Sequence, residues 1–144
     1  MVGQVIRQAY ISRADLQANP QSIFLFGDNM QKTGLAGQAA AMRGEPNACG
    51  VPTKWRPSRH PTAYFTDASF AVPEVRFCID EAFNRAEYWL ARDCDVVIPA
   101  DGLGTGLADL PTRAPKIHAY IESRIQALCN LALAAAPAPS GPQR

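Results

Sequence analysis

Glycines form the two stretches of this chain that are best suited to binding an anion. Gly102-Leu-Gly-Thr-Gly106 follows the apolar, β-branched run 96–98, and Gly27-Asp-Asn-Met-Gln-Lys-Thr-Gly-Leu-Ala-Gly37 follows the apolar run 23–26. Each stretch therefore lies where a buried strand is followed by a helix. At such a turn, free backbone N–H groups and the positive end of the helix dipole favour a bound phosphate. We call 27–37 the first glycine loop and 102–106 the second glycine loop.

Neither loop carries a standard nucleotide fingerprint. The spacing Gly102-x-Gly104-x-Gly106 differs from the dinucleotide motif, and no Lys-Ser or Lys-Thr pair follows it as in a P-loop. Alone, the second glycine loop is either a phosphate-binding loop or a structural turn between a strand and a helix. Two such loops in one small chain can hold a diphosphate from opposite sides, so together they favour a nucleotide-diphosphate site.

Length and composition predict one globular domain. The chain has 144 residues, of which 47% are hydrophobic and 19% charged, as in ordinary globular proteins. We expect this domain to span residues 1–133 and the Ala/Pro-rich segment 134–144 to be a disordered tail. The formal net charge of +1 does not indicate direct nucleic-acid binding.

The cysteines and the apolar runs bear on cofactors and localisation. Four cysteines lie far apart without a Cys-x-x-Cys pair, so we expect reduced thiols, no metal site and no cofactor. No apolar run has the length of a signal peptide core or a membrane span. The sequence therefore predicts a cytoplasmic protein that does not contact a membrane.

Alternating strand and helix patterns position the glycine loops. Strands are expected at 4–11, 23–26, 48–54 and 96–98, with the first and third near sheet edges, and helices at 12–18, 34–43, 73–91 and from 111 to about 131. The proline-rich segment 55–71 is expected to be a mobile loop with a short strand at Tyr64-Phe65. This alternation predicts a three-layer α/β/α domain with helices on both faces of a mostly parallel or mixed central sheet.

Ligands of such sheets bind outside the carboxyl ends of the strands. Three connecting loops qualify by this rule, at 27–37, 52–57 and 99–110.

The order of these pieces resembles a macrodomain, the ADP-ribose-binding module. The matching pieces are Ser12-Arg-Ala-Asp15, Gly27-Asp-Asn29, Gly34-Leu-Ala-Gly-Gln-Ala39 and Ile98-Pro-Ala-Asp-Gly-Leu-Gly-Thr-Gly106. They span most of the chain, from Tyr10 to Leu128. The resemblance implies a macrodomain-like α/β/α fold and binding of ADP-ribose or a related NAD-derived nucleotide.

The resemblance also implies roles for individual residues. Asp15 would accept a hydrogen bond from the exocyclic amine of adenine, and Asn29 would bind the distal ribose. The first diphosphate segment would be Gly34, Leu35, Ala36 and Gly37, with Asp28 beside it. The second would be Gly102, Leu103, Gly104, Thr105, Gly106 and Leu107. Phe70 or Tyr64 could stack on a base or ribose, although core packing is the better explanation of an aromatic residue.

A narrower similarity concerns Val51-Pro-Thr-Lys-Trp-Arg-Pro-Ser58, which resembles the Thr-Lys strand and polar loop of the terminal ADP-ribose protein glycohydrolase branch. It implies that Thr53 contacts the ligand and that Lys54 stands at the place of the catalytic lysine. A lysine amine can attack the ring-opened ribose aldehyde and form a Schiff base, provided that burial or a neighbouring cation lowers the pKa of the amine.

Departures from the hydrolase patterns favour binding over hydrolysis. Ala108 stands where the lysine branch has an aspartate, and Asp109 follows one residue later. Ala36 stands where the other hydrolase branch has an acid. Asp28 and Asp101 are the remaining nearby acids, and each could orient a water or cap a loop.

These observations leave three functions open. The first is binding of ADP-ribose, free or attached to a macromolecule. The second is an ADP-ribosyl hydrolase that acts on protein or nucleic acid, with Lys54 as nucleophile and Asp109 or Asp101 as acid/base. The third is a structural or interaction protein whose glycine loops are only tight turns. The small residues of 34–43 leave room for a close-packed dimer, but the oligomeric state stays open.

Overall fold

The computed structural model describes residues 1–135 as an α/β fold around a four-stranded sheet. Its strands are β1 (Val5–Gln8), β2 (Ile23–Asn29), β3 (Ala48–Lys54) and β4 (Val96–Pro99), in the spatial order β1-β4-β2-β3. Strands β1 and β3 form the two edges, as predicted, and an edge position accommodates a proline such as Pro52 in β3.

The predicted mixed sheet is wrong for the described residues, because all pairings between the four strands are parallel. A helix-containing connection lies between successive strands and returns the chain to the same end of the sheet, which makes neighbouring strands parallel. An antiparallel contact occurs only as an isolated bridge between Lys54 and Tyr64. The short strand expected at Tyr64-Phe65 therefore does not form.

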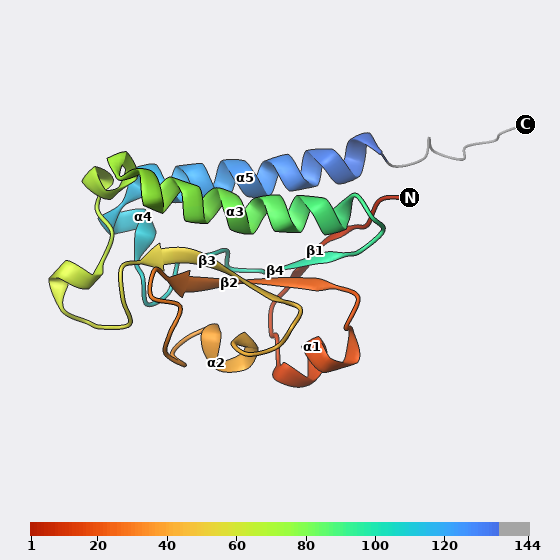
Figure 1. Ribbon diagram of the computed structural model, residues 1–144, viewed down its shortest axis with the longest axis horizontal. Helices are drawn as coiled ribbons and strands as arrows, with labels where there is room; N and C mark the ends of the chain where they lie inside the picture. The colour runs from red at the N-terminus through yellow and green to blue at the C-terminus, as the bar shows by residue number, and fades with distance from the viewer. Residues whose placement is uncertain (136–144) are drawn as a thin grey trace, which may run out of the picture.

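Helices lie over both faces of the sheet (Figure 1). Helices α1 (Arg13–Ala18) and α2 (Ala39–Met42) cover one face, and α3 (Pro73–Leu90) and α5 (Pro115–Ala134) lie side by side over the other, with the short α4 (Leu110–Arg113) before α5. Segment 55–71 contains two 3-10 helices, η1 (Pro61–Ala63) and η2 (Asp67–Ala71). Within residues 1–135, no helix combines the length and the hydrophobicity that crossing a bilayer requires.

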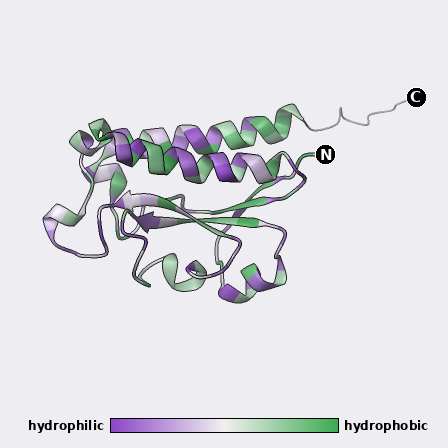
Figure 2. Cartoon of the chain, in the orientation of Figure 1, coloured by the Kyte–Doolittle hydropathy of each residue, from purple (hydrophilic) through white to green (hydrophobic). Residues whose placement is uncertain are grey.

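Alternating side chains of β2 fill a hydrophobic core on each face of the sheet. Ile23 and Leu25 belong to the core beneath α3 and α5, whereas Phe24 and Phe26 belong to the core beneath α1 and α2. Figure 2 shows β2 as hydrophobic over much of its length and hydrophilic at its carboxyl end. Burial of both faces explains the continuous apolar run in the sequence, and the polar end marks where β2 leaves the core.

Two predicted elements have different bounds because of their backbone surroundings. The small-residue helix begins at Ala39 rather than Gly34, since Gly34 and Gly37 have φ values of +94° and +60°, which a right-handed helix does not tolerate. Strand β2 continues past Phe26 to Asn29, because β3 pairs with these last residues.

At the ends of the chain, β1 is shorter than the expected 4–11. The tail expected from residue 134 lies, from residue 136 onward, outside the described residues.

Candidate functional site

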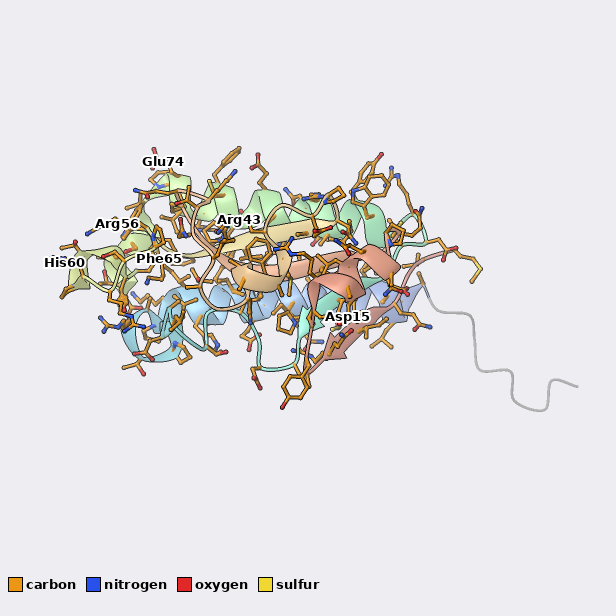
Figure 3. All side chains as sticks on the ribbon, turned by 90° about the horizontal axis from the view of Figure 1, so that it is seen from below. Asp15, Arg43, Arg56, His60, Phe65 and Glu74 are labelled. Carbon is orange, nitrogen blue, oxygen red and sulfur yellow. The ribbon has the colours of Figure 1, made fainter. Side chains whose placement is uncertain are left out.

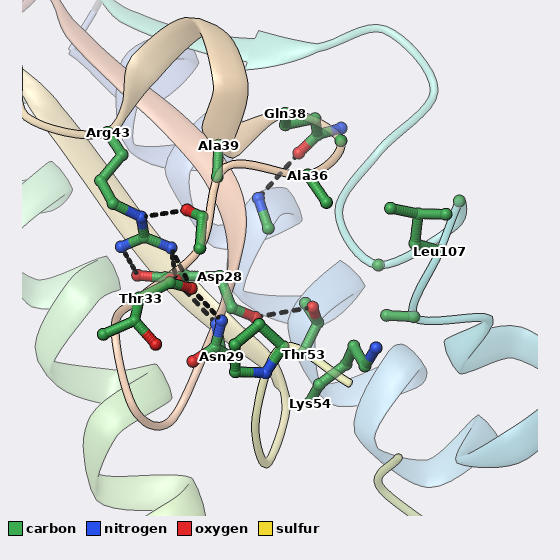
Figure 4. Close-up of a pocket in the computed structure, with 17 residues that line it drawn as sticks. Asp28, Asn29, Thr33, Ala36, Gln38, Ala39, Arg43, Thr53, Lys54 and Leu107 are labelled. Carbon is green, nitrogen blue, oxygen red and sulfur yellow. Dashed lines mark hydrogen bonds and ion pairs between the residues drawn. The ribbon is translucent and has the colours of Figure 1, made fainter. Parts of the chain in front are cut away.

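A pocket of about 360 Å³ lies at the carboxyl ends of the central strands, and we call it the strand-end pocket (Figure 4). Its walls come from residues 27–43, 53–57 and 104–108, which overlap the three loops selected from the sequence. The volume lies within the range of small-molecule sites. The topological rule therefore identified the position of this pocket.

The structure brings ten of the predicted site residues together in the wall of the strand-end pocket. They are Asp28, Asn29, Gly34, Ala36, Gly37, Thr53, Lys54, Gly104, Gly106 and Leu107. Seven others do not line it: Asp15, Leu35, Asp101, Gly102, Leu103, Thr105 and Asp109.

Backbone N–H groups are the donors that both glycine loops offer. Within the described part of the chain, the amides of residues 34–37 and of residues 104–107 donate to no protein acceptor. Several of these residues line the strand-end pocket from opposite loops. Unpaired amides next to a pocket need either water or a ligand as acceptor, and they suit the oxygens of a phosphate.

Arg43 connects the first glycine loop to the end of β2. Its guanidinium donates to both carboxylate oxygens of Asp28 and, within the loop, to the carbonyls of Thr33 and Gly34. The Asp28 carboxylate also accepts from the backbone amide of Asn29. Asp28 thus caps the loop and pairs with an arginine, and its oxygens are already occupied by these donors rather than free to orient a water.

Gln38 joins the two glycine loops directly. Its side-chain oxygen accepts from the Gly27 amide at 2.7 Å, and its side-chain nitrogen donates to the Gly102 carbonyl at 3.2 Å. Across the pocket opening, a Cβ placed on Gly37 would lie 3.4 Å from the Leu107 side chain, which is 53% exposed. The loops are therefore joined by a polar contact and approach each other at an apolar rim.

Asn29 and Lys54 lie opposite each other in the register of β2 and β3. The Asn29 side chain shapes the first glycine loop, because it donates to the Thr33 carbonyl and accepts from the Gln31 amide. The neighbouring Thr53 is buried and donates to the Asp28 carbonyl. This register brings the predicted ribose-binding asparagine and the predicted catalytic lysine to one end of the pocket.

Lys54 has a lowered pKa. Desolvation by the surrounding protein is the main cause, and the positive charges of Arg113 and Arg59 add to it. The amine donates to the Ser58 carbonyl at 2.7 Å and lies 4.4 Å from the ring centre of Tyr64. Arg113 lies over the same ring at 3.7 Å, so the Tyr64 ring is in contact with two cations.

The second glycine loop is held mainly by its own backbone and by the core. Its Gly102 amide donates to the Pro99 carbonyl, and the Leu110 amide returns to the Gly104 carbonyl at 2.8 Å. Leu103 is fully buried in the core beneath α3 and α5, which explains why it does not line the pocket. Thr105 is exposed, and its hydroxyl donates to the Asp101 carbonyl.

The two candidate acids of the second loop lie outside the strand-end pocket. Asp109 precedes α4 as its N-cap residue, with a left-handed φ of +50°, and its carboxylate lies 3.6 Å from the Arg113 guanidinium. Asp101 is exposed on the preceding turn. Ala108 occupies the pocket wall where the hydrolase resemblance has an acid.

Asp15 takes part in the capping box that the sequence predicts for α1. Its backbone amide donates to the Ser12 hydroxyl, and its carboxylate accepts from the Ser12 amide and from Gln8. These hydrogen bonds, the Ser12 amide first, lower the pKa of Asp15. Figure 3 shows Asp15 on α1, away from Arg43, and Asp15 does not line the strand-end pocket.

Sequence reasoning missed Gln38 and Arg43, the two side chains that organise the pocket. Both fell inside the segment expected to be a helix, where polar side chains are ordinarily assigned to the solvent. The positive-φ glycines at 34 and 37 were the available signal, because a loop in their place leaves the following polar residues free to turn inward. Thr33 and Pro57 also line the pocket without having been predicted.

One protein-family model matches the chain, a family of unknown function (DUF7831), over residues 6–124. No curated protein and no solved structure matches it. The matched region contains both glycine loops, Arg43 and Lys54, so the whole strand-end pocket lies within the family's shared sequence.

Proposed function

The chain belongs to DUF7831, a family of unknown function, and we propose that it binds ADP-ribose or a related NAD-derived nucleotide through its two glycine loops. One observation carries the proposal: unpaired backbone amides of both loops belong to residues around a single pocket of about 360 Å³. A diphosphate offers acceptors on both sides, so it can satisfy the two sets of amides at once.

The electrostatics of the pocket support an anionic ligand. Lys54 lies in the wall, and Arg113 and Arg59 are close enough to lower its pKa. Asp28, the acid in the wall, is neutralised by Arg43. In a chain with a net charge of only +1, this local excess of positive charge attracts a diphosphate to the pocket.

The proposal includes the macrodomain resemblance and its three-layer arrangement for residues 1–133. Helices on both faces of the sheet and a pocket at the strand ends support it. Asn29 and Lys54 would lie near the distal ribose, and Asp15 would reach the adenine from outside the pocket. Four unpaired cysteines support a reducing, cytoplasmic location.

Calorimetric titration tests the binding function. We expect ADP-ribose to bind with measurable heat and ribose 5-phosphate to bind more weakly, because it lacks the second phosphate and the adenine. NAD, cyclic ADP-ribose and macromolecule-linked ADP-ribose then define which form is preferred. Absence of heat with ADP-ribose, cyclic ADP-ribose and NAD alike would overturn the proposal.

A second candidate function, removal of ADP-ribose from a macromolecule, is favoured by the lowered pKa of Lys54 next to Asn29. A neutral amine would attack C1″ of the distal ribose, the acceptor would leave with a proton, and the ring would open to a Schiff base. Addition of water would then release ADP-ribose and regenerate the amine. Asp109 or Asp101 would supply the acid and base, after movement toward the pocket.

Turnover and trapping separate the two functions. If the lysine mechanism operates, borohydride traps an ADP-ribose adduct on Lys54 of the wild type, and Lys54→Ala abolishes turnover while Lys54→Arg does not restore it. Equal turnover by wild type and Lys54→Ala excludes the lysine mechanism. ADP-ribose binding without turnover in either protein leaves binding as the function.

A further inference from the structure

We propose that Arg43 is a positioning residue for the nucleotide site, because its ion pair with Asp28 fixes the first glycine loop in the form that receives the ligand. This inference rests on the proposed function. Arg43 would act without contacting the phosphates, through the carbonyls of Thr33 and Gly34 and the carboxylate of Asp28 (Figure 4).

The guanidinium of Arg43 joins the carboxylate of Asp28, at the end of β2, to the backbone of residues 33–34 in the first glycine loop. Within the described residues, Arg43 Nε donates to the Gly34 carbonyl at 2.6 Å, Nη2 donates to the Thr33 carbonyl at 3.1 Å, and Nη1 donates to Asp28 Oδ2 at 3.2 Å. The side chains of Arg43 and Asp28 are 20% and 6% exposed. Because the pair is largely buried, removing Arg43 leaves the buried carboxylate of Asp28 without its counterion.

Asp28 packs closely against the backbone of Gly50 on β3. A Cβ on Gly50 would lie 2.5 Å from Asp28 Oδ2, so the missing side chain at position 50 creates the space that the carboxylate fills. The Asn29 amide donates to the other carboxylate oxygen at 2.8 Å. The end of β2 therefore supplies Arg43 with a fixed anchor.

The first glycine loop depends on this anchor because it has little structure of its own. Residues 33–37 are exposed, their amides donate to no acceptor in the described part of the chain, and α2 begins only at Ala39. The Asn29 side chain adds one further contact, to the Thr33 carbonyl. These amides are the donors that the proposed function assigns to the diphosphate, so their placement before binding sets the affinity.

Arg13 provides a matched control within the same molecule. Its guanidinium also binds two carbonyls and one carboxylate, those of Ala40, Arg43 and Glu45. These contacts hold α2 and the turn after it, and none of them reaches Asp28, Thr33 or Gly34. Arg13→Ala and Arg43→Ala therefore remove similar sets of hydrogen bonds at different places.

The experiment measures ADP-ribose affinity by calorimetry and, without ligand, hydrogen exchange of the amides of Asn29, Gln31 and Lys32, which are hydrogen-bonded within the first glycine loop. We expect Arg43→Ala to weaken ADP-ribose binding about ten- to hundred-fold, as expected when donors lose their preorganised geometry. Exchange of these three amides should be faster in this variant, because the loop that protects them opens more often. Arg13→Ala should leave both quantities within about two-fold of wild type, because its partly exposed ion pair contributes little and none of its contacts reaches Asp28, Thr33 or Gly34.

Chemical rescue of Arg43→Ala with free guanidinium tests whether Arg43 positions the loop or only stabilises the fold. Asp28 and Arg43 also line a neighbouring cleft of about 400 Å³, through which a small cation can reach the vacated place in Arg43→Ala. Free guanidinium, far below denaturing concentrations, should restore affinity to Arg43→Ala and should not change Arg13→Ala. Arg43→Lys keeps the charge but not the fork of donors, so it should bind more weakly than wild type and remain folded if Arg43→Ala does not.

The outcomes separate this inference from the proposed function. Wild-type affinity in Arg43→Ala, or in Arg43→Lys if the alanine variant does not fold, overturns the positioning role. If the wild type does not bind ADP-ribose, the proposed function fails, and hydrogen exchange then decides the role of Arg43. Unchanged exchange of the Asn29, Gln31 and Lys32 amides overturns the inference, and faster exchange that guanidinium reverses supports it.

Discussion

The two glycine loops border the same pocket but are held in place by different means. The second glycine loop is fixed by backbone hydrogen bonds, such as the one from the Leu110 amide to the Gly104 carbonyl, and by the buried side chain of Leu103. The first glycine loop is fixed by polar side chains, chiefly those of Arg43 and Gln38, which follow the loop, and of Asn29 within it.

Because of this difference, the two glycine loops should tolerate different kinds of substitution. A loop fixed by its backbone and the core tolerates most changes of exposed polar side chains, but not the addition of a side chain where the backbone passes through a narrow space. A loop fixed by a few polar contacts tolerates added bulk at exposed positions and fails when one of those contacts is lost. The pocket thus combines a rigid wall with a wall whose position depends on a few polar contacts.

The largest expected effect comes from Gly104→Val in the rigid wall. A Cβ at this position would lie 2.4 Å from Leu110 and 3.1 Å from Thr53, and φ is +76°. We expect the free energy of unfolding to fall by about 3 kcal/mol or more, through overpacking and backbone strain, with loss of ADP-ribose binding. Gly106→Ala is the control, because nothing lies within 4 Å of its added Cβ. Urea unfolding and calorimetry measure both effects, and equal stability of the two variants would contradict the comparison.

A smaller effect is expected from Gln38→Leu, which separates the two walls without adding bulk. The change removes the acceptor for the Gly27 amide and the donor to the Gly102 carbonyl. We expect a loss of about 1 kcal/mol in the free energy of unfolding, the cost of unpaired polar groups. The free energy of ADP-ribose binding should fall by more than this amount, because both glycine loops lose their connection.

Gln38→Glu sharpens this result. It keeps an acceptor for the Gly27 amide but places a negative charge beside the proposed diphosphate, so affinity should fall further than in Gln38→Leu while stability falls less. Wild-type affinity in both variants would show that the loops do not need their polar bridge.

The smallest expected effect concerns the pKa of Lys54. The charge of Arg113, in α4 just after the second glycine loop, acts on this pKa. Arg113 is a cause of the lowered pKa of Lys54, after desolvation, so Arg113→Ala should raise that pKa toward the ordinary lysine value. Only the neutral amine reacts with acylating reagents. The pH of half-maximal labelling of Lys54, followed by mass spectrometry, should therefore move upward in Arg113→Ala and stay near wild type in Arg113→Lys. An unchanged profile in Arg113→Ala would remove Arg113 as an influence on the lysine.

Much of the fold was predictable because its signals are local. The apolar runs of β2 and β4, the three- and four-residue periodicity of α3 and the Ser12 capping box each identify an element from neighbouring residues. The position of the pocket followed from topology, because parallel strands place their carboxyl ends at one edge.

The organisation of the site was not predictable in the same way, because it depends on contacts between distant residues. Arg43 meets Asp28 only because Gly34 and Gly37 prevent an earlier start of α2, and Gln38 reaches Gly102 across 64 positions of sequence. A polar residue next to a run of alanines carries no local sign of such a partner. The expected strand at Tyr64-Phe65 was wrong for a similar reason, because 3-10 helices form around it and leave only one bridge to Lys54.

The fit of Asp28 into the space left by Gly50 has an evolutionary consequence. Positions 28, 43 and 50 form a unit in which a carboxylate, a guanidinium and an absent side chain depend on one another, although they lie on β2, after α2 and on β3. Related sequences should therefore change these three positions together. A descendant that gained a side chain at position 50 would have to give up the carboxylate at 28, and with it the selective pressure that keeps arginine at 43.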